Sequence, residues 1–140
     1  MYLYENLKEI FKDYPYIVSA YLFGSQASGV FGPMSDVDIA ILLNDNAPKG
    51  RELMHKQDYL SYRISKALGV KDVDMVVLNN QGSIFQHNVI RTGKLIYDAA
   101  PLLRIKFIMR VISTFCDFEP TLRLVEKFHF RGQMRRCASL

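Results

Sequence analysis

The chain has 140 residues, of which 49% are hydrophobic and 23% charged, and it carries a formal net charge of +4. This balance is typical of one globular domain and excludes wholesale disorder, and no apolar run approaches the roughly 18 residues that a transmembrane helix needs. The N-terminal residues lack the basic and then apolar pattern of a signal peptide, so we expect a cytoplasmic protein that does not bind membranes.

The first half of the chain alternates helical and strand patterns. The predicted elements are a helix over 2–14, a strand over 16–23, a short helix over 26–30, a strand over 36–43 and a helix over 51–68. Pro15 ends the first helix, because the residue before a proline is disfavoured in the helical conformation. Gly69 ends the last one, because glycine readily adopts the left-handed conformation found after helix C-termini. The residues of that helix expected to face inward are Leu53, Met54, Leu60, Ile64 and Leu68.

The second half ends in a long helical pattern. The elements before it are a strand over 73–78, a helix over 83–92 and an edge strand over 93–97. From residue 100, apolar residues occur around most of the helix circumference, so this helix needs cover on more than one side, and we expect Cys116 to be buried in it. Pro120 is predicted to break or kink the helix, a second segment follows over 121–130, and residues 131–140 are expected to fray.

Together these elements predict an α/β (α+β) fold, with a small mixed sheet of about four strands, flanking helices and a C-terminal helical extension. We expect a core over 1–98 and an extension over 99–140 that packs on the core or on a partner, in a homo- or hetero-oligomer. The core has 10 Lys and Arg against 11 Asp and Glu, whereas the extension has 8 against 3 and a net charge of +5. Such a basic helix is either a solvated face or a docking surface for RNA, a membrane surface or an acidic protein. No RNA-binding signature accompanies it, so docking to a protein is favoured over direct nucleic-acid binding.

A Gly-Ser pair, Gly24-Ser25, directly follows the first predicted strand. Such a turn lets the backbone approach a phosphate closely, with the following amide groups pointing at the anion. Ten residues after Ser25, Asp36 and Asp38 lie at positions i and i+2 of the next strand, so their carboxylates point to the same face. A phosphate cradle beside a carboxylate pair indicates metal-dependent handling of a nucleoside triphosphate.

The third strand offers another carboxylate, because Asp72-Val-Asp74 repeats the pattern of Asp36-Val-Asp38. If the two strands are neighbours, one of Asp72 and Asp74 points toward the pair, and Asp74 is preferred because Asp72 is better explained as a strand-start residue. Facing carboxylates repel one another, and Mg²⁺ would remove that conflict. Two Mg²⁺ ions about 4 Å apart would bind the triphosphate, orient an attacking hydroxyl and stabilise the leaving pyrophosphate. Asp74 would lie near the acceptor hydroxyl and help to remove its proton.

The residues Phe23-Gly-Ser-Gln-Ala-Ser-Gly29 and Ser35-Asp-Val-Asp-Ile-Ala-Ile41 closely resemble the motif of the minimal nucleotidyltransferases of the DNA polymerase beta superfamily. The chain length, the aspartate in Val73-Asp-Met-Val-Val77 and the segment Gly93-Lys-Leu-Ile-Tyr97 before a helical tail more particularly resemble the MntA-type antitoxins. Those antitoxins pair with HEPN-domain toxins. The resemblance implies a polymerase-beta-like nucleotidyltransferase fold over nearly the whole chain.

By this resemblance the chain is expected to transfer AMP from ATP, in a Mg²⁺-dependent reaction, to a tyrosine of a cognate HEPN ribonuclease toxin and so silence it. Gly24 and Ser25 would bind the triphosphate. The catalytic and metal-binding residues implied are Asp36, Asp38 and Asp74. Many relatives carry a basic residue where Ser28 stands here, so either triphosphate binding is weaker or Lys or Arg from elsewhere compensates, and the reaction class is expected to be the same.

Two alternatives to this function remain open at the level of sequence. A nucleotidyltransferase with a small-molecule hydroxyl acceptor would use the same chemistry, but the residues after Asp98 leave little room for a substrate-binding portion. An antitoxin that neutralises its toxin by binding alone would explain the apolar C-terminal helix. Three carboxylates brought together argue for catalysis, since a purely docking protein has no physical need for them.

Overall fold

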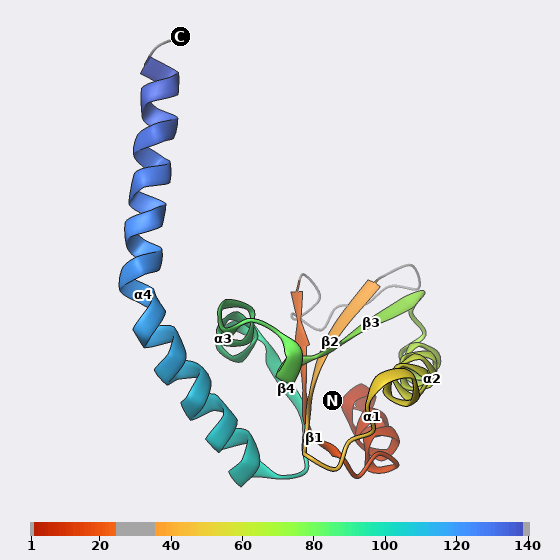
Figure 1. The fold of residues 1–140 in the computed structure, drawn as a ribbon. Helices are drawn as coiled ribbons and strands as arrows, with labels where there is room; N and C mark the ends of the chain where they lie inside the picture. The colour runs from red at the N-terminus through yellow and green to blue at the C-terminus, as the bar shows by residue number, and fades with distance from the viewer. Residues whose placement is uncertain (1, 25–35, 139–140) are drawn as a thin grey trace.

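A computed structural model of the protein describes residues 2–24 and 36–138, which form an α/β unit with one long helix projecting from it (Figure 1). The elements are α1 (Tyr2–Lys12), β1 (Ile17–Phe23), β2 (Asp36–Leu43), α2 (Gly50–Leu68), β3 (Asp72–Val77), the short 3₁₀ helix η2 (Leu78–Asn80), α3 (Ser83–Thr92), β4 (Lys94–Asp98) and α4 (Pro101–Ala138). Element boundaries lie within one or two residues of the predicted ones up to the start of α4. The short helix predicted over 26–30 lies outside the described residues.

The four strands form one mixed sheet in the order β3-β2-β1-β4. β1 pairs antiparallel with β2 and with β4, whereas β2 and β3 are parallel. A parallel pair needs a long crossover connection, and α2 supplies it. Gly69 takes the left-handed conformation (φ 66°) that ends α2, as expected. The mixed sheet of four strands with β4 at one edge is therefore confirmed.

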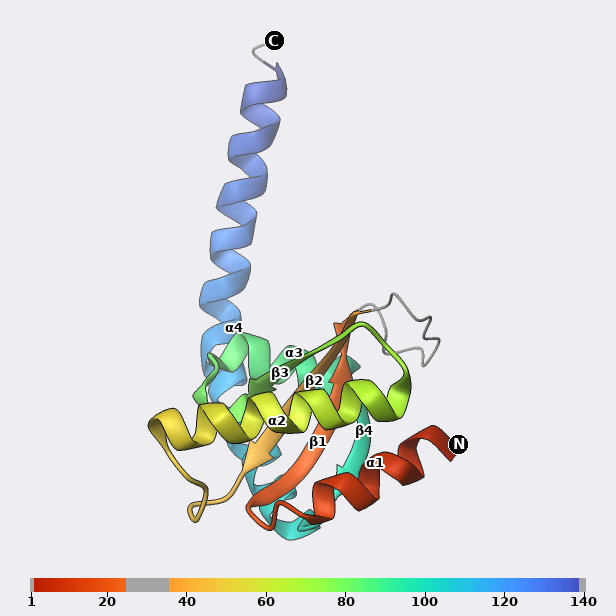
Figure 2. The same ribbon diagram turned by 90° about the vertical axis from the view of Figure 1, so that its right-hand side faces the viewer.

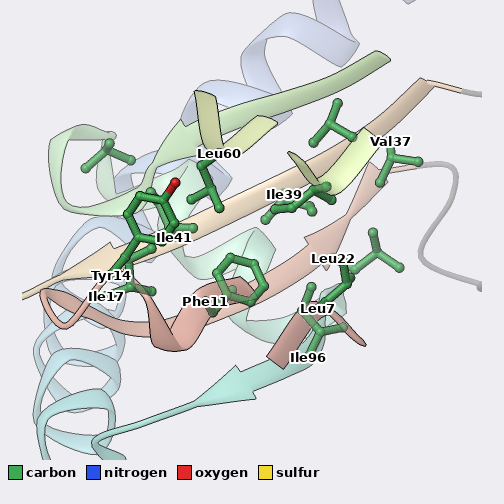
Figure 3. Packing of buried hydrophobic residues seen from close by; sticks show 14 of the residues in the cluster. Leu7, Phe11, Tyr14, Ile17, Leu22, Val37, Ile39, Ile41, Leu60 and Ile96 are labelled. Carbon is green, nitrogen blue, oxygen red and sulfur yellow. The ribbon is translucent and has the colours of Figure 1, made fainter. Parts of the chain in front are cut away.

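Both faces of the sheet are covered, and by different helices (Figures 1 and 2). On one face, Val37 and Ile39 of β2 pack with Leu7 and Phe11 of α1 and with Leu60 of α2 (Figure 3). The opposite face carries a smaller apolar cluster that joins the sheet to α3 and α4: Val18, Tyr21, Ala40, Leu42, Leu78, Val89, Phe107 and Val111. Because side chains alternate along a strand, the residues of β2 that do not join the first cluster point toward α3 and α4.

The long helix α4 is covered by the sheet on one side only. Phe107 and Val111 are buried, whereas the residues on another side of the helix are 44% to 77% exposed: Leu102, Ile105, Met109 and Ile112. We call these four residues the outer stripe. An ion pair between Arg104 and Asp98, with Nε and Oδ1 3.1 Å apart, anchors the start of the helix to the end of β4. The cover expected on more than one side is thus absent within the part of the chain that the structure describes.

Three expectations about helical residues are wrong. The residues expected to fray are helical up to Ala138. Pro120 does not break α4, and of the two outcomes predicted for it the kink agrees with Figure 1, where the helix changes direction along its length. Cys116 is exposed, because it falls outside the single stripe that packs on the domain. Met54 of α2, expected to face inward, is also exposed, because the inward stripe of that helix runs through Leu60 and Ile64. Within the described residues, we find no helix whose length and apolar content would let it cross a membrane.

Candidate functional site

The turn that follows β1 lies directly against a carboxylate of β2. Gly24 has a φ of 78°, which places it in the left-handed region that side chains disfavour. A Cβ at this position would lie 2.6 Å from Oδ2 of Asp38. Glycine is therefore favoured at this position for two separate reasons, its backbone conformation and the space that Asp38 occupies. Ser25, the other residue expected at the triphosphate, lies outside the described residues.

The strand register places the predicted acidic residues side by side. In the parallel pairing of β2 with β3, Asp36 lies opposite Asp72, and Asp38 lies opposite Asp74. Val37, Ile39 and Val73 belong to the cluster under α1 and α2, and Met75 packs against it, so all four aspartates project from the other face. The expectation that only one of Asp72 and Asp74 points toward the pair is wrong, because residues two apart on a strand share a face.

The charges of three of these carboxylates are coupled. The pKa of Asp38 is raised above its usual range, first by partial burial and then by the negative charges of Asp74 and Asp36. Asp72 is not among the groups that raise it, which distinguishes Asp74 as the neighbour of the pair. Among the ion pairs of residues 2–24 and 36–138, none involves Asp36, Asp38 or Asp74. A cation would relieve this mutual repulsion.

The fit of a metal ion to these residues is good in chemistry and incomplete in geometry. Carboxylate oxygens are ligands that Mg²⁺ prefers, and one or two carboxylates with water and phosphate oxygens complete its usual shell. Within the described chain, however, no three Asp, Glu, His or Cys side chains lie together closely enough to hold an ion. Asp36 and Asp74 are exposed at the end of the sheet and free to rotate, so a rotamer change would bring them toward Asp38.

An aromatic contact beside the site had no signal in the sequence. Phe23, which pairs with Asp38 across the β1–β2 ladder, meets the ring of Phe85 edge-on at a centroid distance of 5.5 Å. Phe85 belongs to α3, so this helix lies next to the strand end that carries the acidic residues. The contact joins residues more than 60 positions apart, and no local pattern around Phe85 predicts it.

Comparisons with known proteins agree with this arrangement. The family model described as polymerase beta, nucleotidyltransferase, matches residues 5–101. A solved structure described as a toxin-antitoxin with AMP-PNP is similar, with a TM-score of 0.68 and 22% identity, and the match covers 91% of this chain and 98% of that chain. Another, described as a tri-AMPylated Shewanella oneidensis HEPN toxin in complex with MNT antitoxin, has a TM-score of 0.66 and 21% identity, with 92% and 97% covered. At these identities the two likenesses show a shared fold. No curated protein matches the chain in sequence.

Proposed function

The chain belongs to the polymerase beta nucleotidyltransferase family, and on that premise we propose that it transfers AMP from ATP to a tyrosine hydroxyl of a HEPN ribonuclease toxin, whose antitoxin it is. The observation that carries the proposal is that the Asp38 carboxylate fills the space where a Cβ of Gly24 would lie, with Asp74 directly across the ladder from Asp38. Gly24, the residue that we propose approaches the phosphates, and the three mutually repelling carboxylates thus share one end of the sheet. The fold shared with structures of a toxin-antitoxin holding AMP-PNP and of an AMPylated HEPN toxin complex supports this acceptor class.

Each residue then has a separate role. Asp36, Asp38 and Asp74 would hold Mg²⁺, which when bound neutralises charge on the triphosphate and on the leaving pyrophosphate. Gly24 lets the backbone approach the phosphates without displacing Asp38. Asp38 is the most shielded carboxylate of the three, and its position between β1 and β3 makes it the central ligand.

In the proposed reaction, the tyrosine oxygen attacks the α-phosphorus of ATP. A new P–O bond forms to the tyrosine, the bond to the bridging oxygen of the β-phosphate breaks, and pyrophosphate leaves with that electron pair. The proton of the hydroxyl passes to a nearby carboxylate, for which Asp74 is our candidate, because it is exposed at the edge of the cluster. The products are an AMP-tyrosine ester and pyrophosphate.

One observation favours a second function, neutralisation of the toxin by binding without catalysis. The outer stripe of α4 is an exposed apolar surface on a small domain, and such surfaces mark interaction sites. Both functions predict a complex with the toxin, so binding alone does not separate them. Replacement of the carboxylates does.

The test is the intact mass of the toxin after co-expression or incubation with ATP and Mg²⁺. We expect the wild-type chain to raise the toxin's mass by whole AMP increments, and the Asp36→Ala/Asp38→Ala variant to leave it unchanged. Asp72→Ala is the matched control, because Asp72 projects from the same face but is not coupled to Asp38. Neutralisation of the toxin by the double variant, without mass change, would establish the binding antitoxin instead. AMP transfer only to small hydroxyl compounds would contradict the protein acceptor.

A further inference from the structure

An open apolar groove lies where α3 meets α4. Its volume is about 670 Å³, and it is lined by Gly82, Ile84, Phe85, His87, Asn88, Arg91 and Phe115. We call it the α3–α4 groove. His87 stacks flat on Phe115, with ring centroids 3.7 Å apart and planes 4° apart, which fixes the two helices to each other at this point. Ile84 is 54% exposed although it is a large apolar residue.

The α3–α4 groove adjoins the candidate site. Phe85, one of its lining residues, packs on Phe23, and Phe23 pairs with Asp38 across the ladder. The Phe85 and Phe23 rings therefore connect the groove to the strand that carries Asp38. A molecule seated in the groove would thus lie on the side of the sheet end where α3 meets β1, next to the ladder position of Asp38.

Next to the groove, α4 continues past Phe115 to Ala138, which is more surface than the binding of a small substrate requires. We call residues 116–138 of α4 the arm. The C-terminal part of α4 projects far past the sheet in both views (Figures 1 and 2). Leu124 and Val125 on this arm are 54% and 58% exposed. Residues 116–138 of this helix span about 35 Å at 1.5 Å per residue, so the arm is long enough to contact a protein-sized partner.

Charge indicates what kind of molecule would cover this surface. Residues 99–140 carry a net charge of +5, no residue lining the groove is acidic, and Arg91 stands at its rim. Two copies of the chain paired along their arms would bring like charges together, which opposes self-association. A partner with an acidic surface and a projecting apolar side chain would complement both the positive charge of residues 99–140 and the apolar lining of the groove.

We propose that the α3–α4 groove and the adjoining arm of α4 are the docking site for the protein that accepts the nucleotide. The acceptor would insert an apolar side chain beside Ile84 and Phe115 and place acidic side chains near Arg91. This proposal rests on the proposed function, because it takes the HEPN toxin as the acceptor. It assigns recognition of the acceptor to α3 and α4, and the chemistry to β2 and β3.

The test measures binding separately from catalysis. In the Asp36→Ala/Asp38→Ala background, the dissociation constant of the unmodified toxin is determined by calorimetry for Ile84→Asp and for Met109→Asp. Both change an exposed apolar helix residue to aspartate, but Met109 lies on the outer stripe, away from the groove. An aspartate in the first turn of α3 is favourable to the helix, so Ile84→Asp should fold. We expect Ile84→Asp to weaken binding about tenfold or more and Met109→Asp to change it less than about threefold.

Equal affinities of Ile84→Asp and the parent, or a loss with Met109→Asp alone, would overturn the proposal. Should Ile84→Asp prove unfolded by circular dichroism, Arg91→Glu gives the same comparison through charge at the groove's rim. In the catalytically active chain, Ile84→Ala should raise KM for the toxin and leave KM for ATP unchanged. A rise in KM for ATP alone would assign the groove to the nucleotide, and a chain dimer that Ile84→Asp dissociates would assign it to a second copy. If the wild-type chain binds the toxin but transfers no AMP, the proposed function is refuted. The comparison of Ile84→Asp with Met109→Asp still tests the docking site in that case.

Discussion

Replacement of Gly24 by alanine tests the link between the turn and the carboxylate most directly. The added Cβ would lie 2.6 Å from Oδ2 of Asp38, whereas ordinary contacts begin at 3.4 Å, so the two must separate by about 0.8 Å. The contacted atom is the far end of a partly exposed side chain, so Asp38 should rotate away and the fold should survive. A misplacement of about 1 Å at a reacting centre can cost roughly a hundredfold in rate. We therefore expect Gly24→Ala to lower the rate of AMP transfer about a hundredfold.

The control is Gly69→Ala, which has a similar backbone conformation without the contact. Gly69 has a φ of 66°, close to the 78° of Gly24, but a Cβ there would meet nothing within 4 Å. The left-handed conformation costs a residue with a side chain about 1–2 kcal/mol, so both variants should melt about 3–8 °C below wild type. Only Gly24→Ala should lose activity, measured as AMP transferred per minute at a temperature where both variants are folded.

Two results would refute this reasoning. Wild-type activity of Gly24→Ala would mean that the position of Asp38 is unimportant for the reaction. An equal loss of activity in Gly69→Ala would mean that backbone strain, and not the displaced carboxylate, lowers the rate.

Two further predictions concern single groups of the sheet. Asp74→Asn removes a negative charge that raises the pKa of Asp38, so the pKa of Asp38 should fall, as a carboxyl ¹³C NMR titration in metal-free buffer would show. A raised pKa means that ionised Asp38 lowers the stability of the fold at neutral pH, so Asp74→Asn should be more stable than wild type there. This difference in stability should vanish when the pH falls below the pKa of Asp38. An unchanged titration of Asp38 in the variant would contradict the electrostatic effect of Asp74. Ser19 is fully buried in β1, and its hydroxyl has no hydrogen-bond partner in the described part of the chain, so Ser19→Ala should raise the free energy of unfolding by about 1 kcal/mol in urea titrations. A loss of stability in Ser19→Ala would show that the hydroxyl of Ser19 has a hydrogen-bond partner in solution.

Much of the fold could be predicted because its signals are local. The end of α2 at Gly69 follows from one residue's tolerance of a positive φ, and the strand β2 follows from an apolar run that begins at Asp36. The family motif could be recognised for the same reason, since Gly24, Asp36 and Asp38 lie within a short stretch of chain. The sharing of a face by Asp36 and Asp38 needs only the alternation of a strand.

The expectations that were wrong concern residues whose burial depends on what packs around them. Periodicity indicated that α4 has apolar residues on several sides, but it could not show that the sheet covers only the side of Phe107 and Val111. For the same reason Cys116 and Met54 were expected inside and are exposed. Pro120 lacks an amide donor, yet the hydrogen bonds of neighbouring residues carry α4 past it.

The sequence by itself determined the elements of this protein and the chemistry of its candidate site, because helix periods, strand alternation and a short motif are properties of neighbouring residues. Only the tertiary structure decided that Asp74 lies opposite Asp38, that Gly24 touches the Asp38 carboxylate, and that Phe85 of α3 lies beside them. These contacts depend on strand order and register, which are set by how the two apolar faces of the whole sheet are buried. No short stretch of the chain contains that information.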